Sequence, residues 1–144
     1  MARFQQILVP IDFDRTSTDA LEYAVELAAK LGAHVTVLHV LQAPPYDPQV
    51  PEDSAQTDGS LVMEAKRNLS AAVRRARRHG STISELLRQG LPWEEIQLAS
   101  VDIGADLIVM GTHGRRGIAR LLLGSVAQSV VQTSAVPVLM VRGG

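Results

Sequence analysis

Residues 105–114 read ADLIVMGTHG, and residues 122–127 read LLGSVA. Residues 105–110, which are apolar except for Asp106, predict a buried strand, and a turn with Gly111 and Gly114 follows it directly. A helix is expected over residues 125–133, so it would begin close to the end of that strand. A buried strand, a tight turn and a helix in this order predict an α/β fold, in which ligands bind at the carboxyl ends of the strands.

The rest of the chain repeats this alternation of strands and helices. Runs rich in Val, Ile and Leu predict strands over residues 4–12, 33–41, 82–89, 105–110 and 136–141. Apolar residues at helical spacing predict a helix after each of the first four strands. Thr16 or Ser17 is expected to cap the first helix, Gly32 to end it, and the second helix to end near Gly80. This order predicts a three-layer α/β sandwich with a five-stranded, mainly parallel sheet and four helices.

Composition limits the function classes. Hydrophobic residues make up 46% of the 144 residues and aromatic residues only 3%, so the core must be aliphatic. The chain has no cysteine, which excludes disulfides, thiolate metal sites and cysteine nucleophiles. A net charge of −1 gives no general attraction to nucleic acid or to an anionic membrane. With no long apolar run and no signal-peptide layout at the start, we expect one cytoplasmic domain over residues 1–144.

Residues 42–59 interrupt the alternation. They are polar and contain Pro44, Pro45, Pro48 and Pro51. Neither flank is long enough to be a second domain, so this stretch is expected to be a mobile surface loop rather than a linker.

The segment after the fourth expected strand has the composition of a phosphate cradle. Gly111 and Gly114 leave backbone N–H groups open to a ligand, and Gly124 and Ser125 begin a helix whose N-terminus favours an anion. Arg115 and Arg116 would add positive charge at the rim. The two better-known phosphate motifs, the P-loop and the dinucleotide fingerprint G-x-G-x-x-G, are absent.

The spacing Gly111-x2-Gly114-x9-Gly124-Ser125 resembles the nucleotide-binding signature of the universal stress protein family, in its ATP-binding branch. The resemblance covers essentially the whole chain, from ILVPIDF at the start through HVTVLHV to the terminal VPVLMVR. It implies a Rossmann-like fold of the adenine nucleotide alpha hydrolase type. It also implies a homodimeric stress-response protein whose subunits meet through the last strand, from Val136 to Val141, and a regulatory protein partner that the sequence does not name.

The resemblance also implies the residues of the nucleotide site. Asp12 would contact the nucleoside, Val40 would line the adenine pocket, and Met110 would lie against the base or ribose. ATP or another adenine nucleotide would bind with Mg²⁺ or Mn²⁺ bridging its phosphates, and no protein side chain is expected to hold the metal. The implied set is Pro10, Asp12, Val40, Met110, Gly111, Thr112, His113, Gly114, Arg115, Arg116, Gly117, Gly124, Ser125 and Val126.

Other interpretations of the same residues remain open. Asp12 could cap the helix that follows it, and Gly111 and Gly114 could be turn glycines in a ligand-free interaction protein of the same fold. A genuine ATPase or phosphotransferase would use His113, Arg115 and Arg116. Slow or absent hydrolysis is expected instead, because no lysine and no evident base lie near the cradle.

Two further groups have a simple structural interpretation. The arginines of the second helix, Arg67, Arg74, Arg75, Arg77 and Arg78, are expected to form a solvated face. His34 and His39 lie in an expected strand without metal-ligand spacing, so the sequence assigns them no function.

Overall fold

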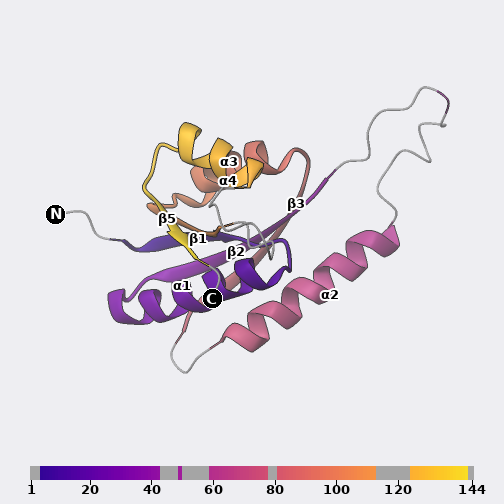
Figure 1. Ribbon diagram of the computed structural model, residues 1–144. Coiled ribbons are helices and arrows are strands. Elements are labelled where there is room, and N and C mark those ends of the chain that lie inside the picture. Colours follow the sequence, from indigo (N-terminus) through magenta and orange to yellow (C-terminus); the bar gives the residue numbers. More distant parts are fainter. Residues whose placement is uncertain (1–3, 43–48, 50–58, 78–80, 113–123, 143–144) are drawn as a thin grey trace.

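A computed structural model describes residues 4–42, 49, 59–77, 81–112 and 124–142. Within these residues, five strands and four helices alternate along the chain (Figure 1). In chain order they are β1 (Gln6–Pro10), α1 (Arg15–Leu31), β2 (His34–Leu41), α2 (Gly59–Ala76), β3 (Ile83–Gln89), α3 (Pro92–Ile103), β4 (Leu107–Gly111), α4 (Ser125–Thr133) and β5 (Val138–Val141).

The strands form one parallel sheet in the order β3-β2-β1-β4-β5. β1 lies in the centre, where Ile7 pairs with Val35 of β2 and with Leu107 of β4. Helices α1 and α2 cover one face of the sheet, and α3 and α4 cover the other (Figure 1). The winding direction reverses between β1 and β4, so a ligand site is expected at the carboxyl ends of these two strands. The predicted three-layer α/β architecture is confirmed.

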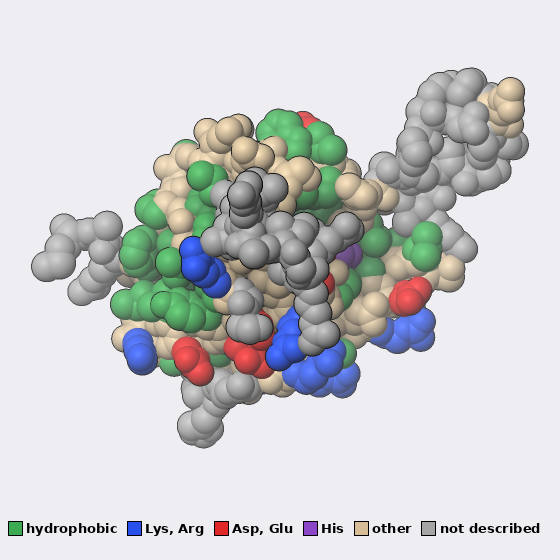
Figure 2. Space-filling model, in the orientation of Figure 1, with side chains coloured by type: hydrophobic (Ala, Val, Ile, Leu, Met, Phe, Trp, Pro, Cys, Tyr) green, Lys and Arg blue, Asp and Glu red, His purple; other side chains and the backbone are tan. Residues whose placement is uncertain are grey.

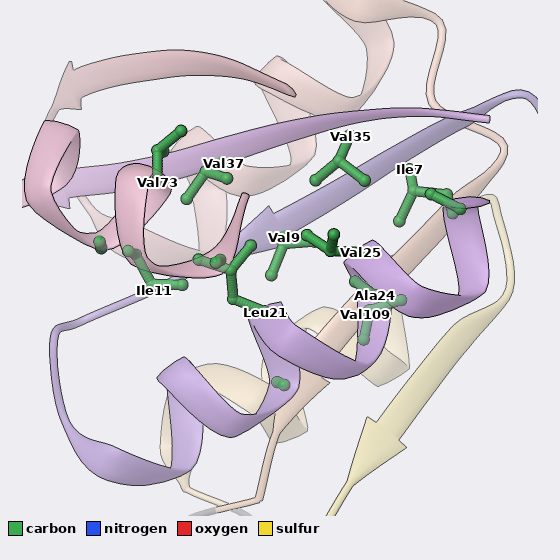
Figure 3. Close-up of a cluster of buried hydrophobic side chains, with 14 of the residues drawn as sticks. Ile7, Val9, Ile11, Leu21, Ala24, Val25, Val35, Val37, Val73 and Val109 are labelled. Carbon is green, nitrogen blue, oxygen red and sulfur yellow. The ribbon is translucent and has the colours of Figure 1, made fainter. Parts of the chain in front are cut away.

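Each face of the sheet has its own aliphatic core. Ile7 and Val9 of β1 pack with Leu21 and Val25 of α1 (Figure 3), whereas Leu8 between them belongs to the core under α3 and α4. Side chains that alternate between two buried faces explain why the central strands read as continuous apolar runs.

The start and end of α1 correct one expectation and confirm another. The helix begins at Arg15 with Asp14 as its N-cap, so neither Thr16 nor Ser17 caps it; both are buried within its first turn. Asp14 takes this role because its carboxylate accepts the Ser17 N–H at 2.9 Å. Gly32 ends the helix with a left-handed φ of 67°, as predicted.

Several other elements are shorter than expected, among them β1, which spans Gln6–Pro10 rather than residues 4–12, and also α2 and β5. The buried stripe of α2 ends at Ala76, where the helix stops before Gly80; residues 78–80 lie outside the described part. β5 begins at Val138 rather than at Val136, because the Val136 N–H bonds to the Ser134 hydroxyl and Pro137 has no N–H. The loop expected over residues 42–59 lies almost wholly outside the described residues.

The edge strand β3 is tied to α3 by charge. The Arg88 guanidinium lies 2.5 Å from an Asp102 carboxylate oxygen and 3.8 Å from Glu95. Gly90, which follows β3, packs against Glu95 so closely that an added Cβ would lie 2.9 Å from Glu95 Cγ. These contacts fix the course of the chain from β3 into α3.

Within the described residues, no helix is long and apolar enough to span a bilayer.

Candidate functional site

A cavity of about 750 Å³ opens at the carboxyl ends of β1, β2 and β4. Every predicted site residue within the described ranges lines it: Pro10, Asp12, Val40, Met110, Gly111, Thr112, Gly124, Ser125 and Val126. The remaining members of the predicted set, His113, Gly114, Arg115, Arg116 and Gly117, lie outside the described residues. The fold therefore gathers into one place residues that come from four separate parts of the sequence.

A hydrogen-bond network orders the turn between β1 and α1. Asp12 Oδ1 accepts the Ser17 hydroxyl at 2.9 Å and the Asp14 N–H at 3.0 Å. The Ser17 hydroxyl oxygen in turn accepts the Asp12 N–H at 3.2 Å. Although the carbonyl oxygen of Asp14 also lies 3.1 Å from Ser17 Oγ, an ionised carboxylate is the stronger acceptor of its single proton. Asp12 is thus held through one oxygen, and within the described part of the chain Oδ2 has no partner.

The helix-cap interpretation of Asp12 can be tested by stability. Asp14→Ala should lower the free energy of unfolding by about 1 kcal/mol, because it removes the N-cap of α1. Asp12→Ala leaves the Asp14 cap in place, and the Ser17 hydroxyl can still bond to the Asp14 carbonyl oxygen, so this variant should cost clearly less. Urea unfolding followed by circular dichroism measures both, and an equal loss in the two variants would show that Asp12 also stabilises the helix start.

Gly111 has a structural role at the end of β4. A Cβ added there would lie 2.6 Å from the Thr16 carbonyl oxygen and 2.8 Å from both Thr16 C and Thr16 Cγ2. The first turn of α1 therefore packs directly on this glycine. This contact accounts for a glycine at this position without any ligand, and it sets the distance between two walls of the cavity.

The N-terminus of α4 differs from that of α1. Its N-cap is Gly124, and within the described part of the chain no side chain caps its first amides. Backbone N–H groups at an uncapped helix start attract anions through the helix dipole. Among the described residues that line the cavity, the charged ones are Asp12 and Asp14 at the opposite wall, and none is Lys or Arg. A phosphate is thus favoured at the α4 wall and disfavoured at the β1 wall.

His39 lines the same cavity, although the sequence assigned it no role. Its Nδ1 lies 2.8 Å from the Ile11 carbonyl oxygen, and its ring centroid lies 4.3 Å from that of Phe13. Phe13 has a positive φ of 70°, which is rare for a residue other than glycine. The sequence signal for this residue was its place next to Val40, at the end of a strand that leads into the cavity.

The described residues contain no group of three or more His, Asp or Glu side chains that could hold a metal ion.

A model of the universal stress protein family matches residues 3–142. The chain belongs to this family. Universal stress protein MJ0531 of Methanocaldococcus jannaschii is 32% identical over 140 residues, which cover 96% of this chain and 82% of that protein. Universal stress protein YxiE of Bacillus subtilis is 32% identical over 149 residues, covering 96% and 99% of the two chains.

Solved structures of universal stress proteins share the fold. The structure of protein MJ0577 superposes with a TM-score of 0.81 at 30% identity, covering 98% of this chain and 97% of that one. A universal stress protein in complex with cAMP gives a TM-score of 0.73 at 28% identity, with coverage of 99% and 100%. The universal stress protein of Archaeoglobus fulgidus in complex with dAMP gives 0.71 at 29% identity, with coverage of 96% and 98%. Two structural neighbours of this chain were thus solved with adenine nucleotides.

Proposed function

We propose that this universal stress protein binds an adenine nucleotide in the cavity at the ends of β1, β2 and β4. The α4 N-terminus carries the proposal: no described side chain caps it, so it offers backbone donors to an anion on the wall opposite Asp12. The complexes of structural neighbours with cAMP and dAMP support the choice of an adenine nucleotide. The proposed ligand is ATP or another adenine nucleotide, together with Mg²⁺ or Mn²⁺.

The two walls of the cavity imply an orientation for the ligand. The nucleoside would lie by Asp12 and Val40, where a carboxylate oxygen accepts hydrogen bonds from hydroxyl or amine donors. The phosphates would lie by Gly124, Ser125 and Val126, where amides and a hydroxyl favour anionic oxygens. Residues 113–117, which the sequence adds to the phosphate side, remain part of the proposal.

We propose further that the protein acts as a homodimeric sensor or regulator in the stress response, with slow or absent ATP hydrolysis. The subunits would meet through β5, whose four residues are all only half-buried in the single chain. Hydrophobic side chains gather on the side of the molecule where β5 lies (Figure 2). An uncovered apolar strand at a sheet edge invites pairing with a second copy.

One observation favours the ligand-free alternative. Because the contact with Thr16 already explains Gly111, part of the glycine pattern would remain in an interaction protein that binds no nucleotide. Identification of nucleotides released from freshly purified, denatured protein separates the two functions. Bound AMP, ADP or ATP supports the sensor, whereas ligand-free protein that gives no heat with saturating Mg-ATP in calorimetry supports the alternative.

Asp12→Asn should weaken AMP binding by about tenfold, because it turns Oδ2, an acceptor with no partner among the described residues, into a donor. Asp14→Asn is the matched control: it removes the same charge from the cavity lining and retains a good N-cap. Isothermal titration of AMP into both variants measures the difference. Equal losses would mean that charge, and not a hydrogen bond from Asp12, governs binding.

A further inference from the structure

The side chain of His39 fastens the turn between β1 and α1 to the end of β2. Ile11 already donates its N–H to the Leu38 carbonyl oxygen at 2.8 Å, as the ladder between the two strands ends. His39 adds a bond from the next residue of β2, with Nδ1 2.8 Å from the Ile11 carbonyl oxygen. A carbonyl oxygen can only accept, so Nδ1 carries the proton and donates it.

The same imidazole holds the other side of the turn. Phe13 stacks on His39 at 4.3 Å between centroids, with the rings inclined by 38°. A left-handed backbone at a residue other than glycine costs of order 1 kcal/mol or more, and it persists only where neighbouring contacts hold it. The ring contact with His39 and the packing of Phe13 against the core under α1 are contacts of this kind.

We propose that His39 is the positioning residue of Asp12. Asp12 lies between Ile11 and Phe13, and His39 contacts both of them, Ile11 through its Nδ1 and Phe13 through its ring. Together with Ser17, which binds Asp12 Oδ1, it fixes the carboxylate at the cavity. This inference rests on the proposed nucleotide site. In that site, His39 would fix the position of the carboxylate that binds the nucleoside.

The conservative replacements of His39 provide the test. Asn places an amide nitrogen near the position of Nδ1, whereas Gln places it near Nε2 and so loses the bond to Ile11. His39→Gln should weaken AMP binding by about tenfold, because it loses the hydrogen bond to Ile11 and leaves the turn less firmly held. His39→Asn should recover most of this affinity. The matched control is His34→Gln, because His34 lies at the start of the same strand and bonds to Ser84 Oγ at 2.8 Å, remote from the cavity.

A double-mutant cycle distinguishes positioning from general stability. If His39 acts through Asp12, the loss from His39→Gln should largely disappear in the Asp12→Asn background. A purely structural role would cause the same loss in both backgrounds. Phe13→Ala, which removes the ring contact and keeps the hydrogen bond, should show the same dependence on Asp12. It replaces His39→Gln in the cycle if that variant does not fold.

Isothermal titration with AMP either supports or overturns the positioning role of His39. Weaker binding in His39→Gln, rescue in His39→Asn and non-additivity with Asp12→Asn support the inference. Tight binding by the wild type with no difference between His39→Gln and His34→Gln, or with additive losses, overturns it and leaves the proposed function intact. No binding of AMP or Mg-ATP by the wild type overturns the proposed function, and the positioning role with it.

Discussion

Gly111→Ala is expected to destabilise the protein by about 3 kcal/mol and to lower its Tm by roughly 10 °C. The added methyl would lie 2.6 Å from the Thr16 carbonyl oxygen, which is backbone and cannot rotate away. The first turn of α1 must move to relieve this overlap. Since Ser17 in that turn holds Asp12, AMP affinity should fall by at least about tenfold as well.

Gly59→Ala is the matched control for this prediction. Gly59 is the first residue of α2, and no heavy atom of the described residues lies within 4 Å of a Cβ added there. The free energy of unfolding of Gly59→Ala should differ from that of the wild type by no more than about 0.5 kcal/mol, as is usual for a surface position. Thermal unfolding of both variants is the measurement, and a Gly111→Ala protein as stable as Gly59→Ala would show that α1 can shift without cost.

Val138→Pro is expected to separate the proposed dimer while leaving the subunit folded. Pro137 and Val141 both direct their carbonyl oxygens to β4, at 3.0 and 2.9 Å from the nitrogens of Ile108 and Thr112. Backbone groups alternate in direction along a strand, so the N–H of Val138 points away from β4, toward the open edge. Proline removes this donor from both copies, and the dimer should dissociate roughly thirtyfold more readily.

Sedimentation equilibrium of the wild type and of two variants measures this effect. Val138→Thr keeps both the backbone N–H and the branched shape, so it should remain a dimer. Thermal unfolding checks that Val138→Pro is folded. A wild-type protein that is monomeric at all concentrations, or a proline variant that associates as tightly as the wild type, would exclude pairing through the β5 backbone.

The order of the elements was predictable because strand and helix periodicities differ and both are strong here. The α4 boundaries, Ser125–Thr133, match the prediction, and the continuous apolar runs in β1, β2 and β4 follow from burial on two faces. The nine described members of the predicted site meet at one cavity because the carboxyl ends of parallel strands share an edge of the sheet.

The errors and omissions have physical causes that lie beyond local sequence. Asp12, Asp14, Thr16 and Ser17 are all good N-cap types within one short stretch, and only the course of the backbone selects Asp14. The role of Gly111 depends on α1, which is distant in sequence and approaches only through tertiary packing. The contact of His39 with Ile11 requires the β1–β2 register, which pairs Pro10 with Leu38.

The two edges of the sheet are unequal. At the β3 edge, Glu85 is exposed and Arg88 is engaged with Asp102 and Glu95, so a strand docking there would meet polar and charged side chains. At the β5 edge the side chains are Val138, Leu139, Met140 and Val141. A subunit whose sheet can pair at both edges could form an open-ended polymer. A subunit that can pair at only one edge forms a dimer and has no edge left for a third copy. In the proposed assembly, the charges on β3 therefore prevent further strand pairing, and assembly stops at the dimer.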